Sequence, residues 1–373
     1  MLKVIDRNFL ARSDSYKWTH WRQYPKGTRT VYSYLESRGG LFDETVFFGL
    51  QYYLLAYLSG PVFDLEDIEE AQAMAAEHFG DDTLFNREGW RHLFEKHGGT
   101  LPVRIRAVPE GSVVNTGTPL LTIENTDPEV PWLPGFLEGL LLKVWYPMTV
   151  ASQSRAMAKV IKAHLERTGD PSLLPYKVHD FGFRGVSSEE SAELGGAAHL
   201  TAFRGTDTLP ALWFLRRYYK AKGAAGHSIA ATEHSTITSW GGPEHEVDAF
   251  RNFLQMHPRG MIACVSDSFD IWRACSEHWG TTLRAEVEAR DGVLVVRPDS
   301  GDPIAVVPRV LELLGEKFGY RVNDKGYKVL NPKVRVIQGD GVNLDSIGHI
   351  LNAMERKLWS ADNVAFGCGG ALL

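Results

Sequence analysis

The sequence predicts an α/β protein that combines a β/α barrel-like domain with a mixed, mainly antiparallel β domain. Two observations support this. From residue 176 onward, short apolar segments recur with helical patterns between them, which is the rhythm of consecutive β/α units. Before residue 150, apolar and polar residues alternate between glycine and proline turns, as in antiparallel strands. We therefore expect an N-terminal mixed α+β domain with antiparallel strands over 1–150 and a β/α barrel-like domain over 151–373.

The elements of the first domain follow from residue type and spacing. Residues 28–38 have the β-branched and aromatic content of a strand, and 103–128 alternate as two or more antiparallel strands do. Residues 44–60 read as a largely buried helix, and 65–80 as an amphipathic helix, each closed by a terminal glycine. Residues 136–166 indicate helices interrupted at Pro147.

The second domain contains seven apolar strand candidates in a row. Helical patterns such as ALWFLRRYYKAKG and VVPRVLELLGEKFG lie between them, which favours a parallel β/α barrel or a close relative. The candidates are YKVHDFG (176–182), HLTAFRG (199–205), HSIAATEHS (227–235), MIACVSDS (261–268), VLVVRPDSGDP (293–303), VRVIQGDG (334–341) and NVAFGCGG (363–370).

Polar or glycine residues that packing does not require stand at the end of each strand candidate. Active sites of β/α barrels form at the carboxyl ends of the strands, so these residues are expected to converge on one site. They are Asp180, Arg184, Arg204, Asp207, Glu233, His234, Asp267, Asp270, Arg297, Asp299, Asp340, Gly369 and Gly370.

Composition excludes several classes of protein. The 373 residues carry a net charge of −6, which gives no overall footprint for nucleic acid or an anionic membrane. Three cysteines without CxxC spacing favour reduced thiols over disulfides or zinc. No apolar run reaches the roughly 18 residues of a membrane helix, and the N-terminus lacks a signal-peptide core, so a soluble cytoplasmic protein is expected.

The segment RPDSGDP (297–303) suits phosphate chemistry. Arg297 offers a bidentate fork for phosphate, and Asp299 beside a phosphate suits Mg²⁺. An Arg–Asp ion pair closing a strand is the alternative. The glycines of QGDG (338–341) and GCGG (367–370) let backbone N–H groups approach a phosphate or ribose, although each could be an ordinary tight turn.

Four other side chains are ambiguous from pattern alone. His234 is a catalytic or phosphate-binding candidate, although a lone histidine is more often a surface or core residue; its context does not fit HExxH, which disfavours zinc. Phe181 and Tyr16 would, on pattern alone, usually be aromatic residues of the core. Asp207 fits a helix N-cap.

Nine motifs, in order along the chain, closely resemble the nicotinamide phosphoribosyltransferases. The resemblance runs from about residue 10 to the C-terminus. The motifs are SDSYKWTHWRQYP (13–25), VYSYLESR (31–38), HDFGFRGVSS (179–188), FRGTDT (203–208), EHSTIT (233–238), VSDSFDIW (265–272), RPDSGDP (297–303), VRVIQGDGV (334–342) and AFGCGG (365–370).

The resemblance implies a type II phosphoribosyltransferase that works as a homodimer with active sites at the subunit interface. It would join nicotinamide to phosphoribosyl pyrophosphate in NAD salvage. The resemblance also implies dimer contacts in the N-terminal domain and catalysis in the barrel-like domain. Phe181 of one subunit and Tyr16 of the other, with Asp14 beside it in the motif, would hold the pyridine ring by stacking. Asp207 would accept a hydrogen bond from the carboxamide and repel nicotinate.

The resemblance also implies roles on the phosphate side and two cofactors, Mg²⁺ and ATP. His234 resembles the histidine that ATP phosphorylates in the family. The implied catalytic residues are His234, Arg297 and Asp299, and the implied Mg²⁺ contacts are Asp267 and Asp299. Phosphate, diphosphate and ribose would be bound by Arg184, Arg297, Pro298, Asp299, Gly339, Asp340 and Gly370.

Two departures from the family pattern stand at the end of the sequence. Cys368 and Ala371 replace a serine and a further glycine in the glycine loop. The chain is also expected to stop before the family's C-terminal segment, which would leave the barrel incomplete at its C-terminus. Nicotinate phosphoribosyltransferase is the nearest alternative enzyme, and a catalytically silent homologue that binds pyridine nucleotide is the alternative from another class.

Overall fold

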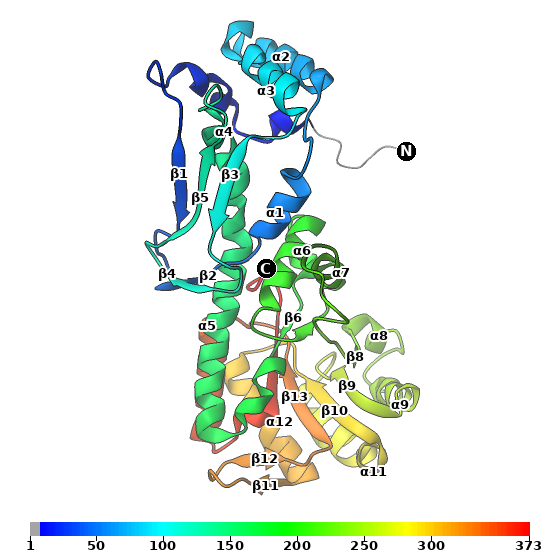
Figure 1. Ribbon diagram of the computed structural model, residues 1–373. Coiled ribbons are helices and arrows are strands. Elements are labelled where there is room, and N and C mark those ends of the chain that lie inside the picture. Colours follow the sequence, from blue (N-terminus) through cyan, green and yellow to red (C-terminus); the bar gives the residue numbers. More distant parts are fainter. Residues whose placement is uncertain (1–7) are drawn as a thin grey trace. The chain divides into compact units, whose positions relative to one another are not determined.

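The computed structural model describes residues 8–373, which form two compact units (Figure 1). The first extends to Ser152 and the second comprises Gln153–Leu373. The division falls within the long helix α5 (Trp145–Thr168). Within residues 8–373, none of the helices has the length and apolar character needed to cross a membrane.

A parallel seven-stranded sheet forms the centre of the second unit. Its strands lie in the order β7-β6-β14-β13-β10-β9-β8, and every neighbouring pair is parallel. An isolated parallel bridge between Gly205 and His227 joins edge strand β7 to the segment that leads into β8. The two edges of the sheet are therefore linked, which makes it barrel-like. The strands are β6 (Val178–Asp180), β7 (Gly205–Thr206), β8 (Ala230–Ala231), β9 (Arg259–Val265), β10 (Asp291–Arg297), β13 (Val334–Gln338) and β14 (Val364–Cys368).

Six of these strands overlap well with the segments predicted from the sequence, whereas the candidate over 199–205 shares only Gly205 with β7, because α6 continues to His199. The barrel-like fold is confirmed. Ala263, Val295 and Ile337 stand on three adjacent strands and form a buried cluster. Phe181, which follows β6, packs against this cluster. The aromatic ring therefore lies between the hydrophobic interior of the sheet and the residues at the strand ends.

Helices follow the strands and carry the chain back along the sheet (Figure 1). In α12, a side-chain cap from Asp302 and a proline at the first position start the helix, and Val307, Val310 and Leu311 form its buried face. The helices are α6 (Glu189–His199), α7 (Leu209–Tyr219), α8 (His234–Thr238), α9 (Glu246–Met256), α10 (Ile271–Arg273), the π-helical segment η7 (Ala274–Thr282), α11 (Arg284–Ala289), α12 (Pro303–Phe318) and α13 (Leu344–Arg356); a small hairpin, β11 (Tyr320–Val322) and β12 (Lys328–Leu330), follows α12.

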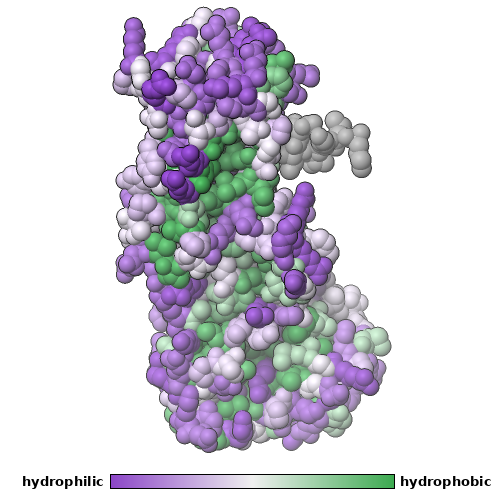
Figure 2. All heavy atoms as spheres, in the orientation of Figure 1, coloured by the Kyte–Doolittle hydropathy of each residue, from purple (hydrophilic) through white to green (hydrophobic). Residues whose placement is uncertain are grey.

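The first unit is built on a three-stranded antiparallel sheet in the order β1-β5-β3. A second antiparallel pair joins β2 and β4. The buried residues of α2 fall on one face at helical spacing, while its outer surface is hydrophilic, as Figure 2 shows. The elements are β1 (Tyr32–Glu36), β2 (Glu44–Val46), α1 (Leu50–Tyr57), α2 (Leu65–Phe79), α3 (Arg87–His97), β3 (Val103–Ala107), β4 (Val113–Asn115), β5 (Pro119–Asn125) and α4 (Leu133–Leu141), with short 3₁₀ turns η1 (Phe9–Ala11), η2 (Ser15–Arg22), η3 (Asp82–Leu84) and η4 (Leu142–Val144).

Two predicted elements of this unit were wrong in detail. The helix predicted over 44–60 begins only at Leu50, because Glu44–Val46 pair with β4 and Gly49, at φ 106°, turns the chain. The helices predicted over 136–166 are present, but α4 and α5 are separated by η4, just before Pro147, and not at Pro147 itself. Pro147 lies in the first turn of α5, where the missing backbone N–H has no intrahelical acceptor to lose.

Candidate functional site

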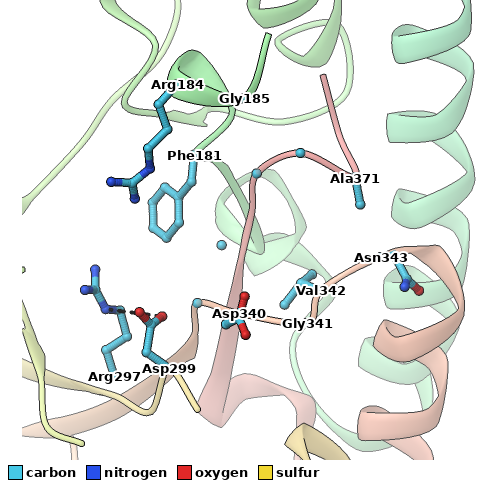
Figure 3. A pocket seen from close by; sticks show the side chains of 14 residues that line it. Phe181, Arg184, Gly185, Arg297, Asp299, Asp340, Gly341, Val342, Asn343 and Ala371 are labelled. Atoms are coloured by element: carbon cyan, nitrogen blue, oxygen red, sulfur yellow. Dashed lines mark ion pairs between the residues drawn. The ribbon is translucent and has the colours of Figure 1, made fainter. Parts of the chain in front are cut away.

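A cavity of about 390 Å³ opens at the carboxyl ends of β6, β10, β13 and β14 (Figure 3). Polar groups, glycines and one aromatic ring line it, which matches the convergence that the sequence predicted. Seven of the predicted site residues contribute to the lining: Phe181, Arg184, Arg297, Asp299, Gly339, Asp340 and Gly370.

Two glycines let side chains lie flat on the walls of this cavity. The ring of Phe181 rests on Gly367 of β14, where a Cβ atom would come within 1.9 Å of the ring. The carboxylate of Asp299 rests on Gly339, where a Cβ atom would lie 2.3 Å from Oδ1. Neither distance is compatible with a larger residue, so the ring and the carboxylate depend on these glycines for their positions.

Arg297 presents an unused donor in a nearly buried position. Its side chain is 13% exposed, and its Nε is 3.8 Å from Asp299 Oδ1, too far for a hydrogen bond. Among the described residues, this buried Nε–H has no hydrogen-bond acceptor. A buried donor left unpaired is costly, and an anionic oxygen in the cavity would satisfy it.

The amino end of helix α13 also borders the cavity. Asn343 caps the helix: its side chain accepts a hydrogen bond from Ser346 N–H, and Ser346 Oγ accepts one from Asn343 N–H. Val342 and Asn343 are cavity-lining residues, so the positive end of the helix dipole favours an anion there. The sequence reasoning missed Asn343, although Asn followed by Ser three residues later before an apolar helix is a start signal.

The surroundings of Asp299 disfavour the charged form of its carboxyl group. Burial raises its pKa, and the nearby charges of Asp267 and Asp340 add to that rise, while Arg297 and His234 oppose it. Asp267 Oδ2 accepts hydrogen bonds from Asp299 N–H at 2.9 Å and from Ser300 Oγ at 2.5 Å. The crowding of carboxylates would be relieved by a cation, so the donor set fits Mg²⁺.

His234 lies beside these carboxylates at the start of α8. Its Nε2 is 3.3 Å from Asp267 Oδ1, and its Nδ1 is 3.9 Å from Asp299 Oδ2. The imidazole is half exposed, whereas Asp267 is almost fully buried. The arrangement leaves His234 accessible while a buried carboxylate orients it.

Asp207 emerges from the strand next to Phe181. Its carboxylate accepts a short hydrogen bond from Ser228 Oγ, and its side chain is exposed. The alternative role as a helix cap is wrong, because the N-cap position of α7 is Thr208. Burial lowers the pKa of the neighbouring His179, and the charge of Asp207 opposes that shift. The lowered pKa favours the uncharged form of the His179 imidazole.

The remaining predicted residues lie elsewhere. Pro298 does not line the cavity; its carbonyl oxygen is 3.4 Å from Gly339 N. Asp14 and Tyr16 belong to the first unit, where Asp14 begins the 3₁₀ turn η2 and the ring of Tyr16 meets His20 edge to face. Tyr16 is 53% exposed, so the alternative of a core aromatic is wrong for this residue.

The two departures in the glycine loop have distinct surroundings. Cys368 is buried, and its thiol donates a hydrogen bond to the carbonyl of Val342 at 3.1 Å. Burial, with a smaller contribution from Asp180, raises the pKa of this thiol to about 12, so it is not a nucleophile. Ala371 lines the cavity, and its carbonyl oxygen accepts a hydrogen bond from Gln153.

Comparison with known proteins agrees with this geometry. Residues 176–373 match the nicotinate phosphoribosyltransferase (NAPRTase) family, and residues 8–105 match the N-terminal domain of nicotinamide phosphoribosyltransferase. Among solved structures, human nicotinic acid phosphoribosyltransferase has a TM-score of 0.59 at 18% identity, covering 95% of this chain and 72% of that one. A nicotinate-nucleotide pyrophosphorylase from Pyrococcus furiosus also has a TM-score of 0.59, at 16% identity, covering 100% and 74%. At these identities the likeness concerns the fold.

Two relatives are similar in sequence over nearly the whole chain. The nicotinamide phosphoribosyltransferase of Xanthomonas campestris pv. campestris is 55% identical over 370 residues, which is 98% of this chain and 78% of the relative. That of Acinetobacter baylyi is 32% identical, over 97% of this chain and 78% of the relative. The barrel-like sheet and the anion-suited cavity at its strand ends are those of a phosphoribosyltransferase acting on pyridine compounds. Within that class, the chain belongs to the nicotinamide phosphoribosyltransferase family.

Proposed function

We propose that this chain transfers the phosphoribosyl group of phosphoribosyl pyrophosphate to nicotinamide, forming nicotinamide mononucleotide and pyrophosphate for NAD salvage. One observation carries the proposal. A single cavity is bordered by an aromatic ring backed by Gly367 and by the buried Arg297 Nε–H, which has no acceptor within the described residues. Such a site suits a substrate pair with one flat ring and one phosphate chain.

Phe181 and Asp207 bind the pyridine substrate. Offset stacking on Phe181 orients the electron-poor ring. Asp207 accepts a hydrogen bond from the carboxamide N–H₂, and its negative charge disfavours the carboxylate of nicotinate. Nicotinate is the competing substrate to test, since residues 176–373 match a family described by that substrate.

Basic residues and glycines bind the phosphate and ribose groups of the second substrate. Arg184 and Arg297 donate to phosphate oxygens, while Gly339 and Gly370 let the backbone come close to ribose and phosphate, with Asp340 beside them. The amino end of α13 adds a favourable potential for the anion. Pro298 lies between Arg297 and Asp299, and its carbonyl oxygen accepts a hydrogen bond from Gly339 N–H.

The chemistry needs little proton transfer. The bond between the anomeric carbon and the pyrophosphate oxygen breaks, and the pyridine nitrogen donates its lone pair to that carbon. The attacking nitrogen bears no proton, so no general base is required. The protein positions the two reactants, and the arginines stabilise the departing diphosphate.

Mg²⁺ is the proposed metal cofactor, with Asp299 as the first ligand and Asp267 beside it. When bound, the ion would neutralise charge on the diphosphate. Asp267 already accepts two hydrogen bonds at Oδ2, and its Oδ1 lies 3.3 Å from His234 Nε2, so a cation at Oδ1 would share that oxygen with the imidazole. The raised pKa of Asp299 supports this choice, because a nearby cation would favour its charged form.

ATP is the proposed second cofactor, acting through phosphorylation of His234. The half-exposed imidazole and the buried Asp267 beside it support the proposal, since a carboxylate favours the tautomer and orientation that a reacting nitrogen needs. We further propose a cytoplasmic homodimer in which Asp14 and Tyr16 of the partner subunit complete each site. The half-exposed Tyr16 ring supports this, because it is free to meet a ligand or another chain.

Formation of nicotinamide mononucleotide from nicotinamide, phosphoribosyl pyrophosphate and Mg²⁺ tests the proposed function. Arg297→Ala should lower kcat/KM by at least about 100-fold, because charged hydrogen bonds to a diphosphate are lost. Arg321→Ala is the matched control, since Arg321 lies exposed on β11. Absence of product from the folded unmodified chain, with nicotinamide or with nicotinate, would overturn the proposal.

A further inference from the structure

A group of side chains in the first unit resembles a metal site and is separate from the cavity described above. His92 and His97 stand on α3, and Asp127 follows β5. Both imidazole Nε2 atoms lie 2.8 Å from the same carboxylate oxygen, Asp127 Oδ2. In the described part of the chain, the three potential ligand atoms lie within 4.8 Å of one another.

The carboxylate of this group is buried and held in place. Asp127 has a side chain only 1% exposed, and its Oδ1 accepts a hydrogen bond from Glu129 N–H at 3.1 Å. Its carbonyl oxygen accepts another from Asn125 Nδ2 at 2.8 Å. These contacts leave Oδ2 facing the imidazoles, which is how a supporting hydrogen bond orients a metal ligand.

The histidines provide both the remaining ligands and an entrance. His92 and His97 side chains are 34% and 25% exposed, so an ion can reach them from solvent. Gly98, at φ 60°, ends α3 immediately after His97 and turns the chain there. The helix end and the turn after β5 thus bring together two nitrogen donors and one oxygen donor from separate elements.

The geometry points to a site for Zn²⁺, or for another divalent transition ion that takes two imidazoles and one carboxylate. We propose that His92, His97 and Asp127 bind such an ion and leave a fourth position for water. Tetrahedral Zn²⁺ with ligand bonds near 2.0–2.1 Å would place its ligand atoms about 3.4 Å apart. The two distances of 2.8 Å therefore need to lengthen by about half an ångström, which these partly exposed histidines allow.

Lys96 competes with the ion. Its Nζ lies 3.1 Å from Asp127 Oδ2, and its side chain is 51% exposed. The ammonium group neutralises the carboxylate and would repel a divalent cation, so it must swing into solvent when the ion binds. The lysine therefore weakens the site and gives a substitution that should strengthen it.

Zinc binding to the full chain tests the proposal, measured by equilibrium dialysis with elemental analysis. All proteins carry His234→Asn, which removes the imidazole beside Asp267 and Asp299 as a possible zinc ligand. His92→Asn should weaken binding of one zinc equivalent by more than about 100-fold, because the loss of a direct ligand exceeds the 10–100-fold effect of a supporting residue. His78→Asn, an exposed histidine on α2 of the same unit, should retain that equivalent.

A second variant keeps the test decisive if His92→Asn fails to fold. Lys96→Ala removes a half-exposed side chain and should bind zinc about tenfold more tightly than the parent, because the repulsion disappears. The proposal is overturned if the parent retains no zinc, if the His92 and His78 variants bind zinc equally, or if the Lys96 variant binds no more tightly.

Discussion

The backbone N–H of Asp207 donates a hydrogen bond to the carbonyl oxygen of Asp180, at 2.9 Å. This contact extends the parallel pairing of β6 and β7 by one step, since Asp180 already pairs with Thr206. Phe181 and Asp207 therefore leave two neighbouring strands at the same edge of the sheet. Asp180 itself is buried and fixes the turn, because its carboxylate accepts hydrogen bonds from Gly182 N–H and Thr206 Oγ1.

Substitution of Asp207 tests whether it recognises the carboxamide. Asp207→Ala should lower kcat/KM for nicotinamide by about 10–100-fold, because a hydrogen bond to a charged acceptor is worth roughly 1.5–3 kcal/mol. Asp207→Asn should reduce the preference for nicotinamide over nicotinate, since it removes the repulsive charge. Competition between the two substrates measures the preference. An unchanged preference in both variants would show that discrimination lies elsewhere.

Replacement of Gly367 tests the support of the Phe181 ring. In Gly367→Ala, the new Cβ would lie 1.9 Å from the ring, so the ring must move away from β14. We expect KM for nicotinamide to rise about tenfold or more, with a smaller change in KM for phosphoribosyl pyrophosphate, because stacking is worth roughly 1 kcal/mol and misplacement adds to that loss. Steady-state kinetics with each substrate varied in turn provide the measurement.

Gly348→Ala is the matched control for that experiment. Gly348 lies on α13, and a Cβ there would meet its nearest neighbour, Val160, at 3.7 Å, an ordinary contact. The helix should gain slightly in stability, and the kinetics should not change. Equal kinetic effects of the two substitutions would contradict the assigned role of Gly367.

The residues at the strand ends could be predicted from sequence because one rule covers them all. Parallel strands end at the same edge, so Arg297, Asp299 and Asp340 had to approach each other once the strands were recognised. The contact of Gly367 with Phe181 could not be predicted in this way. It depends on the pairing of β14 with β6, whose sequence separation hides it from any local pattern.

Two features of the first unit also could not be predicted from local sequence patterns. The strand β2 within 44–60 was missed because three residues are too few for an alternating pattern, and its partner β4 lies far along the chain. The group formed by His92, His97 and Asp127 was missed for a related reason. Its histidines sit five residues apart on α3, a spacing that does not by itself place two ligands on one helix face, and Asp127 lies 30 residues beyond His97, so no local pattern contains all three.

Asp299 should lower the stability of the folded protein while serving the reaction. Because burial raises its pKa above the usual value, ionisation is less favourable in the folded than in the unfolded state at pH 7. Stability from this group is therefore greatest at low pH and is lost as the pH rises through the folded-state pKa. Asp299→Asn should raise Tm by roughly 2 °C at pH 7 and abolish most activity.

A pH series of thermal unfolding provides the control for the Asp299 substitution. The gain in Tm should shrink as the pH falls toward the ordinary pKa of an aspartate, since the native carboxyl becomes protonated and uncharged there. A gain in Tm that stays constant from pH 7 to acid would mean that the effect arises from packing instead of charge.

His234 and Asp267 should act together in the response to ATP. His234→Ala should remove the stimulation of product formation by ATP and leave a basal rate without ATP, because His234 is not among the residues that line the cavity. Asp267→Asn should reduce the stimulation by about tenfold, since it weakens the contact that orients the imidazole. His245→Ala, at an exposed histidine before α9, is the matched control and should respond to ATP like the unmodified protein. Labelled phosphate retained on the protein after mixing with [γ-³²P]ATP reports the reaction directly. Retention of the label by His234→Ala would assign the phosphorylated residue elsewhere and separate ATP coupling from this histidine.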